Sequence, residues 1–124
     1  MNRVTIYRSD GSIYRELDCK RFDQYYGGPI CEITTTDGKV IRTNMPVVVT
    51  GNDFSPSVSI RQPDSHELKN TFDVSLILGD SRERFTKLWE GACMLNQCGS
   101  LVCFWFKDKA VVVSGPVVIE NFHG

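Results

Sequence analysis

The sequence lacks most of the features that usually indicate a chemical function. It contains only two histidines in 124 residues, and its formal net charge is −1. It has no run of about 18 apolar residues, which a membrane-spanning helix needs. A charge so close to zero also excludes a general electrostatic attraction to nucleic acid or to an anionic membrane. We therefore expect neither nucleic acid nor a membrane among its partners.

The motifs of the common enzyme classes are missing as well. We find no glycine-rich phosphate-binding loop, no dinucleotide-binding glycine pattern, no serine-hydrolase elbow and no paired-histidine zinc motif. Ser65, His66 and Glu67 stand side by side, but a catalytic triad is an arrangement in space and not a run of neighbours. The sequence therefore predicts no catalytic residue and no cofactor, and we expect a protein without enzymatic activity.

The five cysteines are not spaced like metal ligands. Cys93, Cys98 and Cys103 recur every five residues, whereas zinc ligands usually come in pairs two to four residues apart. The odd count and the absence of a C-x-x-C pair favour reduced, mostly buried thiols. Because no signal peptide is visible either, we expect a cytoplasmic protein without a bound metal.

Two Asp-Gly dipeptides predict two β-hairpins. Glycine takes the positive φ that a tight hairpin turn needs, and Asp-Gly between β-forming residues is a strong hairpin signal. The hairpins are expected at 4–17, around Asp10 and Gly11, and at 30–43, around Asp37 and Gly38.

The second hairpin has a preferred register. A three-residue loop with a glycine bulge places Ile33 opposite Ile41 and Glu32 opposite Arg42. This arrangement forms an apolar pair on one face of the hairpin and an ion pair on the other. We therefore predict this register.

A loop at 18–29 is expected to join the hairpins. It contains Tyr25 and Tyr26 beside two glycines. The tyrosines either pack on the core or form a contact surface, and packing is the preferred interpretation. Further loops are expected at 51–56, which contains Phe54, and at 62–71.

The second half of the chain also contains strand patterns. Apolar and polar residues alternate over 72–78, which predicts a strand with one buried face. The continuous apolar run at 101–106 predicts a strand that is buried on both faces. Shorter strands are expected at 46–50, 57–61, 110–113 and 117–122.

One segment, 80–97, has the apolar spacing of a helix. Its apolar residues recur at intervals of three and four positions, as on one helical face. Asp80 and Glu83 form a capping-box pattern at its start, and Gly99 follows its end. The apolar residues of this face are Phe85, Leu88, Trp89, Ala92 and Leu95.

Together these elements predict a mainly β protein of one domain, 1–124. The expected architecture is a β-sandwich or a partly open barrel of short antiparallel strands. The helix at 80–97 should lie across the sheet and pack against the strand at 101–106.

This order of elements resembles the small virion proteins of bacteriophages, especially the tail-tube and tail-completion class. The resemblance covers element order and size over most of the chain, and no functional residue is transferred from it. It implies a β-sandwich or barrel that forms rings by pairing strand edges, without catalysis. If the protein is viral, its place would be the virion.

We therefore expect a structural or assembly subunit that binds protein, as a homo-oligomer or within a larger complex. A monomeric domain that binds a peptide or small ligand is the first alternative, and a small enzyme without a recognisable motif is the second. The candidate assembly surface consists of turn and loop residues: Asp10, Gly11, Tyr25, Tyr26, Asp37, Gly38 and Phe54.

Overall fold

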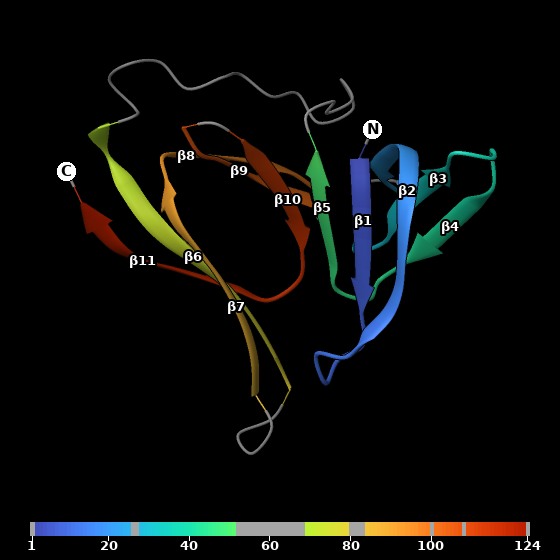
Figure 1. Ribbon diagram of the computed structural model, residues 1–124, viewed down its shortest axis with the longest axis horizontal. Coiled ribbons are helices and arrows are strands. Elements are labelled where there is room, and N and C mark those ends of the chain that lie inside the picture. Colours follow the sequence, from blue (N-terminus) through green and yellow to red (C-terminus); the bar gives the residue numbers. More distant parts are fainter. Residues whose placement is uncertain are drawn as a thin grey trace.

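The computed structural model describes residues 2–25, 28–51, 69–79, 84–99, 101–107 and 109–123. Within these ranges the chain forms eleven strands and no α-helix. The strands make two antiparallel sheets (Figure 1). The prediction of a mainly β protein is therefore confirmed.

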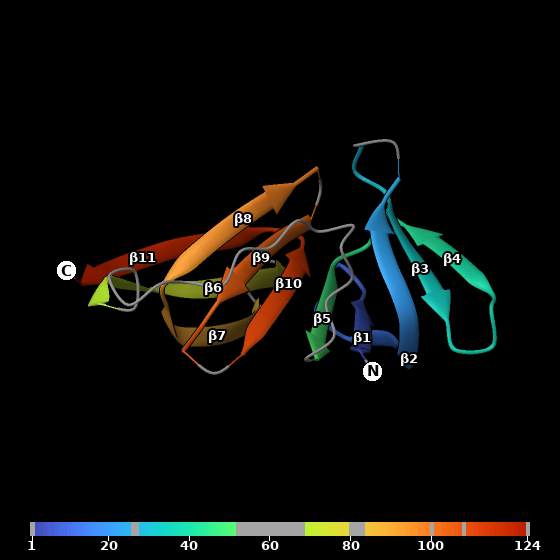
Figure 2. The same cartoon turned by 90° about the horizontal axis from the view of Figure 1, so that it is seen from above.

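The larger sheet has eight strands in the order β4-β3-β2-β1-β5-β10-β9-β8. It curls along its width (Figure 2), and the turn after β8 reaches the end of β2. A methyl group added at Gly99 would overlap the side chain of Gln24. The sheet does not close into a barrel, because its edge strands β4 and β8 are not paired with each other. Its strands are β1 (Asn2–Tyr7), β2 (Ile13–Gln24), β3 (Cys31–Thr35), β4 (Val40–Thr43), β5 (Val47–Gly51), β8 (Met94–Cys98), β9 (Leu101–Trp105) and β10 (Ala110–Ser114).

The smaller sheet has three strands in the order β11-β6-β7. They are β6 (Thr71–Gly79), β7 (Arg84–Ala92) and β11 (Val117–His123). This sheet covers the convex face of β5, β9 and β10, so the molecule is a sandwich on this side (Figure 2).

Strands β5 and β10 lie between two hydrophobic cores. All three valines at 47–49 and all three at 111–113 are buried. Val47, Val49 and Val112 face a first core inside the curl of the larger sheet. Val48, Val111 and Val113 face a second core between the two sheets. Such double-sided burial explains why these segments are continuous runs of a residue that favours strands.

The two predicted hairpins are present. In the second one, Ile33 lies opposite Ile41 and Glu32 opposite Arg42, which confirms the predicted register. The first hairpin is longer than predicted, because β2 continues to Gln24. The expected loop at 18–29 was therefore wrong over residues 18–24, which pair with β1 or β3.

The helix predicted at 80–97 is wrong. Residues 84–92 form β7, which pairs with β6, and residues 94–98 form β8, which pairs with β9. Asp80 and Glu83 lie outside the described residues. A helix would place Leu88 and Trp89 on the same apolar face. In strand β7 they point to opposite faces of the sheet, so Leu88 is 51% exposed and Trp89 is 8% exposed.

Gly91 explains how one segment joins two sheets. Its φ is +82°, a conformation that glycine adopts without the strain other residues meet. The pairing of β6 with β7 shifts register near this point, which is the mark of a β-bulge. The chain bends there, leaves the smaller sheet and enters the larger one as β8. The same glycine would weaken a helix by about 1 kcal/mol relative to alanine.

The remaining strands of the second half agree with the sequence. Residues 71–79, 110–114 and 117–123 form β6, β10 and β11. Strand β9 is covered on both faces, as predicted, but its partner on the convex side is the smaller sheet and not a helix. The strand predicted at 57–61 and most of the loop predicted at 62–71 lie outside the described residues.

Candidate functional site

The first hairpin turn is attached to the smaller sheet. Gly11 is buried, and the backbone N–H of Gly79 donates to the carbonyl of Ser9 at 2.8 Å. Asp10 is exposed and accepts hydrogen bonds from the N–H and the hydroxyl of Ser12, at 2.9 and 2.6 Å. These bonds stabilise the carboxylate and lower the pKa of Asp10. The turn therefore has a structural role beside the last residue of β6.

The second hairpin turn is exposed. The Thr35 hydroxyl donates to the Asp37 carboxylate, and this bond lowers the pKa of Asp37. Gly38 has a φ of +88°, and a side chain added there would meet no atom within 4 Å. The two turns lie at different ends of the larger sheet (Figure 1), so the structure does not bring the two Asp-Gly pairs together.

Tyr25 packs on the second hairpin. Its ring lies under the Arg42 guanidinium, with 4.3 Å from the Arg42 carbon to the ring centroid. Arg42 also donates to Glu32 at 2.8 Å, and the N–H of Tyr25 donates to the carbonyl of Ile30 at 2.8 Å. These contacts fit the packing role for Tyr25. Tyr26 and Phe54, from the same candidate surface, lie outside the described residues.

A feature that the sequence analysis missed is the incomplete pairing of β2. Over residues 13–19 this strand pairs with β1 on one side. On its other side, pairing with β3 begins only at Cys19, which lies opposite Thr35. Within the described part of the chain, the edge of residues 13–18 that faces away from β1 has no strand partner. The side chains of Ile13 and Tyr14 on this half-strand are 48% and 56% exposed.

A depression of about 310 Å³ lies where this open edge meets the second hairpin turn. Three of its charged groups are paired: Asp18 with Arg3 at 3.3 Å, and Asp37 with Lys39 at 3.8 Å. Arg15 has no ion pair with any described residue. Within the described part of the chain, Arg15 is thus the cation of this depression that has no ion-pair partner. Its described lining is Arg15, Leu17, Asp18, Thr35, Thr36, Asp37 and Lys39.

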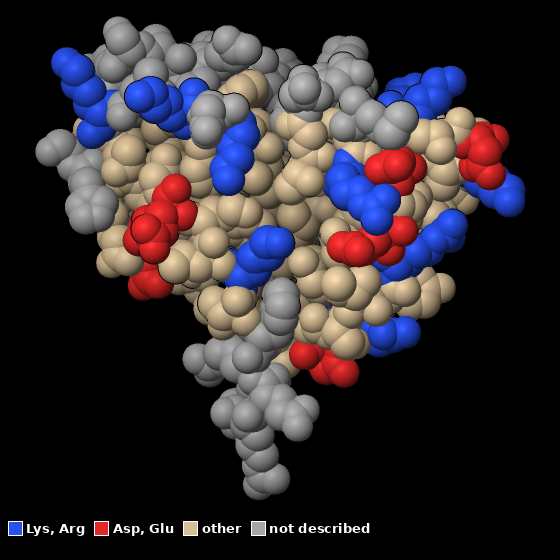
Figure 3. Space-filling model, viewed as in Figure 1, with Lys and Arg blue, Asp and Glu red and all other residues tan. Residues whose placement is uncertain are grey.

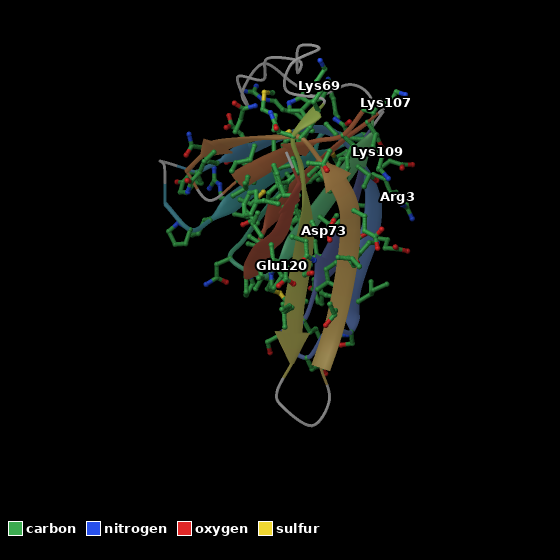
Figure 4. All side chains as sticks on the ribbon, turned by 90° about the vertical axis from the view of Figure 1, so that its left-hand side faces the viewer. Arg3, Lys69, Asp73, Lys107, Lys109 and Glu120 are labelled. Carbon is green, nitrogen blue, oxygen red and sulfur yellow. The ribbon has the colours of Figure 1, made fainter. Side chains whose placement is uncertain are left out.

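The outer face of the smaller sheet carries a second exposed surface. Leu88 and Val118 flank Ser75 in one cross-strand row and are 51% and 42% exposed. Asp73 and Glu120 form a neighbouring acidic pair on this sheet (Figure 4). This surface therefore has two exposed apolar side chains, Leu88 and Val118, next to the two carboxylates of Asp73 and Glu120.

Charges of both signs are distributed over the rest of the surface in view (Figure 3). Lys69, Lys107 and Lys109 lie near one end of the smaller sheet, away from the acidic pair (Figure 4). Over the half of this face formed by β1 and β2, positive and negative side chains lie next to one another. Surface charge alone therefore does not define a site on this face.

Three of the buried cysteines, Cys19, Cys31 and Cys103, are not activated for chemistry. Burial raises the pKa of Cys19 to about 11 and the pKa values of Cys31 and Cys103 to about 12. The carboxylate of Asp18 adds to the effect at Cys19. A nucleophilic or metal-binding thiol needs the opposite shift. Among the described residues, no group of three or more histidine, cysteine or acidic side chains could hold a metal ion.

A second depression, of about 400 Å³, lies beside the corner between the two sheets. Its described lining is Thr71, Gly91, Cys93 and Lys107. Cys93 donates its S–H to the carbonyl of Trp105 at 3.4 Å, so the thiol is already engaged. This depression is a place where a small ligand could fit.

Comparison with protein-family models, with curated proteins and with solved structures found no match. Within the described residues there is also no helix with the length and hydropathy that crossing a bilayer requires. The function is therefore inferred from the geometry of the strands and their exposed surfaces.

Proposed function

We propose that this protein is a non-enzymatic assembly subunit that binds other protein chains through its strand edges and hairpin loops. The observation that carries the proposal is the open larger sheet, in which β4 and β8 end the order and half of β2 lacks a second neighbour among the described residues. Open edges present unpaired N–H and C=O groups, which readily pair with a strand from another chain.

Exposed apolar side chains near these edges support the proposal. Val40 on β4 is 53% exposed and Leu95 on β8 is 44% exposed. Each lies on a strand at one end of the same sheet, so one subunit offers two different edges. Subunits that join through two different edges form rings or filaments, depending on whether the rotation closes.

The narrower form of the proposal is a ring-forming virion protein of the tail-tube or tail-completion class. It rests on the order and size of the β-elements. The helix that formed part of that resemblance is absent, so the resemblance now depends on the strands alone. The assembly function depends on the open edges and does not require this class.

Native mass tests the assembly function. We expect the purified protein, or the protein in its own cell lysate, to be found in a species larger than the 14.0 kDa chain. Light scattering and native mass spectrometry measure this directly. A monomer at high concentration, with no partner in the lysate, would refute the proposal.

Two edge variants locate the contact. Val40→Lys and Leu95→Lys each place a charge on one edge strand, which should weaken strand pairing with another chain. Thr5→Lys is the control, because it makes a similar change on β1, which has a neighbour on each side. An assembly that is lost equally in the control variant would show a general effect of charge.

A second candidate function is the binding of a small ligand at the depression beside Gly91 and Cys93. Its volume of about 400 Å³ is within the range of ligand pockets. A thermal-shift screen of small molecules, repeated with Lys107→Ala, tests it. A strictly monomeric protein that gains stability from a ligand only when Lys107 is present would favour this function over assembly.

A further inference from the structure

We propose that the open half of β2, residues 13–18, accepts an extended segment of a different protein chain as an additional strand. The segment has an acidic side chain opposite Arg15 and an apolar side chain opposite Leu17, two positions away. This inference rests on the assembly function proposed above, and it names the site and the chemistry of the partner.

The backbone provides the first argument. In an antiparallel sheet, alternate residues direct their N–H and C=O groups to opposite sides of the strand. Residues 13–18 use one side to pair with β1 and have no described strand on the other. A stretch of this length is about 20 Å long, enough for several hydrogen bonds to an added strand. The half-strand is thus a template for strand addition.

Both ends of the template are bounded. At one end the carbonyl of Ile13 accepts a hydrogen bond from Arg8 Nη1 at 2.9 Å. At the other end Thr35 lies opposite Cys19, and the chain turns away into the second hairpin turn. An added strand therefore fits between Arg8 and this turn, and its last residue reaches the depression of about 310 Å³.

Side chains provide the second argument. The pairing of β2 with β1 shifts register at the start of β2, where Ile13 lies opposite Tyr7 and Arg15 lies opposite Ile6. Arg15 and Leu17 therefore share the face that continues into the first core, whereas Ile13 lies on the other face. Leu17 is buried on this face, and Arg15 is exposed. Arg15 forms no ion pair with a described residue, although Asp18 beside it is paired with Arg3. A carboxylate on the added strand would neutralise Arg15, and an apolar side chain two positions away would pack against Leu17 on the same face.

Pairing between two copies of the half-strand is disfavoured by its own charges. A two-fold axis perpendicular to an antiparallel pair places one residue opposite its own copy. The registers that use the whole edge then place Arg15 against Arg15 or Glu16 against Glu16. Like charges directly opposite each other destabilise a strand pair. The charge pattern therefore selects a different sequence as the partner.

Two capped heptapeptides test the inference. TVTETVT has glutamate at the centre and valine two positions to either side, and TVTKTVT differs only in having lysine at the centre. We expect TVTETVT to bind about tenfold more tightly, because one charge is attracted to Arg15 and the other repelled. Fluorescence anisotropy of the labelled peptides measures the affinities, and slower amide exchange at residues 13–18 identifies the site.

A charge-reversal variant tests the role of Arg15 itself. Arg15→Glu should reverse the order, so that TVTKTVT binds more tightly than TVTETVT. Arg21→Glu is the matched control, because Arg21 lies on the half of β2 that is already paired with β3. Equal binding of both peptides to the wild type, or protection of β4 or β8 amides instead, would overturn the inference.

Native mass separates this inference from the proposed function. If wild type and Arg15→Glu assemble equally and neither peptide binds, the assembly function stands and the β2 site is wrong. If TVTETVT protects residues 13–18 but the protein stays monomeric without a partner in its lysate, the β2 site stands and the assembly function is wrong.

Discussion

The two hydrophobic cores of this protein are built in different ways. The first core lies inside the curl of one sheet, and its largest buried side chain is Phe22, accompanied by Cys19, Cys31 and Cys103. The second core lies between two sheets and is rich in aromatic rings. Small thiols suit the concave side of a curled sheet, whereas rings fill the roughly 10 Å between packed sheets. The aromatic residues of the second core are Tyr7, Phe72, Trp89, Phe104 and Phe106.

The comparison shows that β5 and β10 couple the two cores. Their odd and even valines belong to different cores, so a change in one core acts on strands that also line the other. Strand β9 does the same, with Cys103 on one face and Phe104 on the other. We therefore expect the cores to unfold together, and the following predictions test that coupling from the largest effect to the smallest.

The largest effect is expected from removing a buried ring. Phe22→Ala in the first core and Phe104→Ala in the second should each lower the free energy of unfolding by about 3–5 kcal/mol, because each leaves a cavity. Urea unfolding followed by far-UV circular dichroism measures both. Trp89 reports on the second core and Trp105 packs on the first, so Trp105→Phe isolates the signal of Trp89. If Phe22→Ala moves the dichroism transition without moving the Trp89 transition, the cores are independent.

Alkaline pH should act first on the first core. The pKa values of Cys31 and Cys103 are about 12 in the folded protein, against 9.0 ordinarily. Between these values the unfolded chain loses thiol protons that the folded chain keeps, so stability falls as pH rises from about 9 towards 12. Each thiol contributes at most about 1.4 kcal/mol per pH unit.

Cys31→Ala provides the control for the alkaline effect. It should make the fall in unfolding free energy with pH less steep while leaving the protein folded at pH 7, as measured by urea unfolding across the pH series. An unchanged slope would mean that thiol ionisation does not govern alkaline stability. Rapid alkylation of the native thiols at pH 8 would contradict their burial.

Substitutions of two glycines test whether the corner between the sheets contributes to stability beyond the local backbone conformation of Gly91. Gly91 lies at that corner and Gly38 lies in an exposed turn; both have positive φ and open space where a side chain would lie. Gly91→Ala and Gly38→Ala should therefore each cost about 1–2 kcal/mol from backbone strain alone. Thermal unfolding of both variants gives the difference. A much larger cost at Gly91 would show that the corner also sets how the sheets pack.

The smallest effect is expected at the outer end of the curl. Glu32 and Arg42 form an exposed ion pair on β3 and β4. Glu32→Gln should cost about 0.2–1 kcal/mol, and less at high salt, because exposed pairs are screened. Urea unfolding at two salt concentrations checks this. A loss above about 2 kcal/mol would mean that the hairpin end supports the first core more strongly than its exposure indicates.

Local chemistry accounts for the parts of the fold that sequence patterns predicted. The β3–β4 register follows from a turn and two residue pairs within ten positions of each other, Ile33 with Ile41 and Glu32 with Arg42. The segment 84–98 failed because its apolar residues fit a helical spacing by coincidence. In the structure these residues belong to two strands, β7 and β8, which lie in different sheets. The chain bends at Gly91 between the two strands, and no local sequence pattern predicts that bend.

Local sequence patterns were also insufficient to locate the candidate binding surface. Asp10, Gly11 and Tyr25 were proposed as contact residues because turns and aromatic loops often bind partners, and in the structure each of them also makes contacts within the chain. The open half of β2 was missed, since the sequence of 13–18 does not show how far β3 extends along it. The sequence signal for this surface was weak: two large apolar residues, Ile13 and Tyr14, follow each other on the predicted hairpin, so one of them must face away from the core.

Local sequence patterns predicted the short strands, the positions of the Asp-Gly turns and the burial of the segment at 101–106. These features follow from side-chain alternation and turn chemistry within a few residues. The strand order, the curl of the larger sheet and the single-sided pairing of residues 13–18 depend instead on contacts between distant segments of the chain. Pairing between distant strands depends on backbone hydrogen bonds that every residue except proline can form, so it leaves little trace in the sequence.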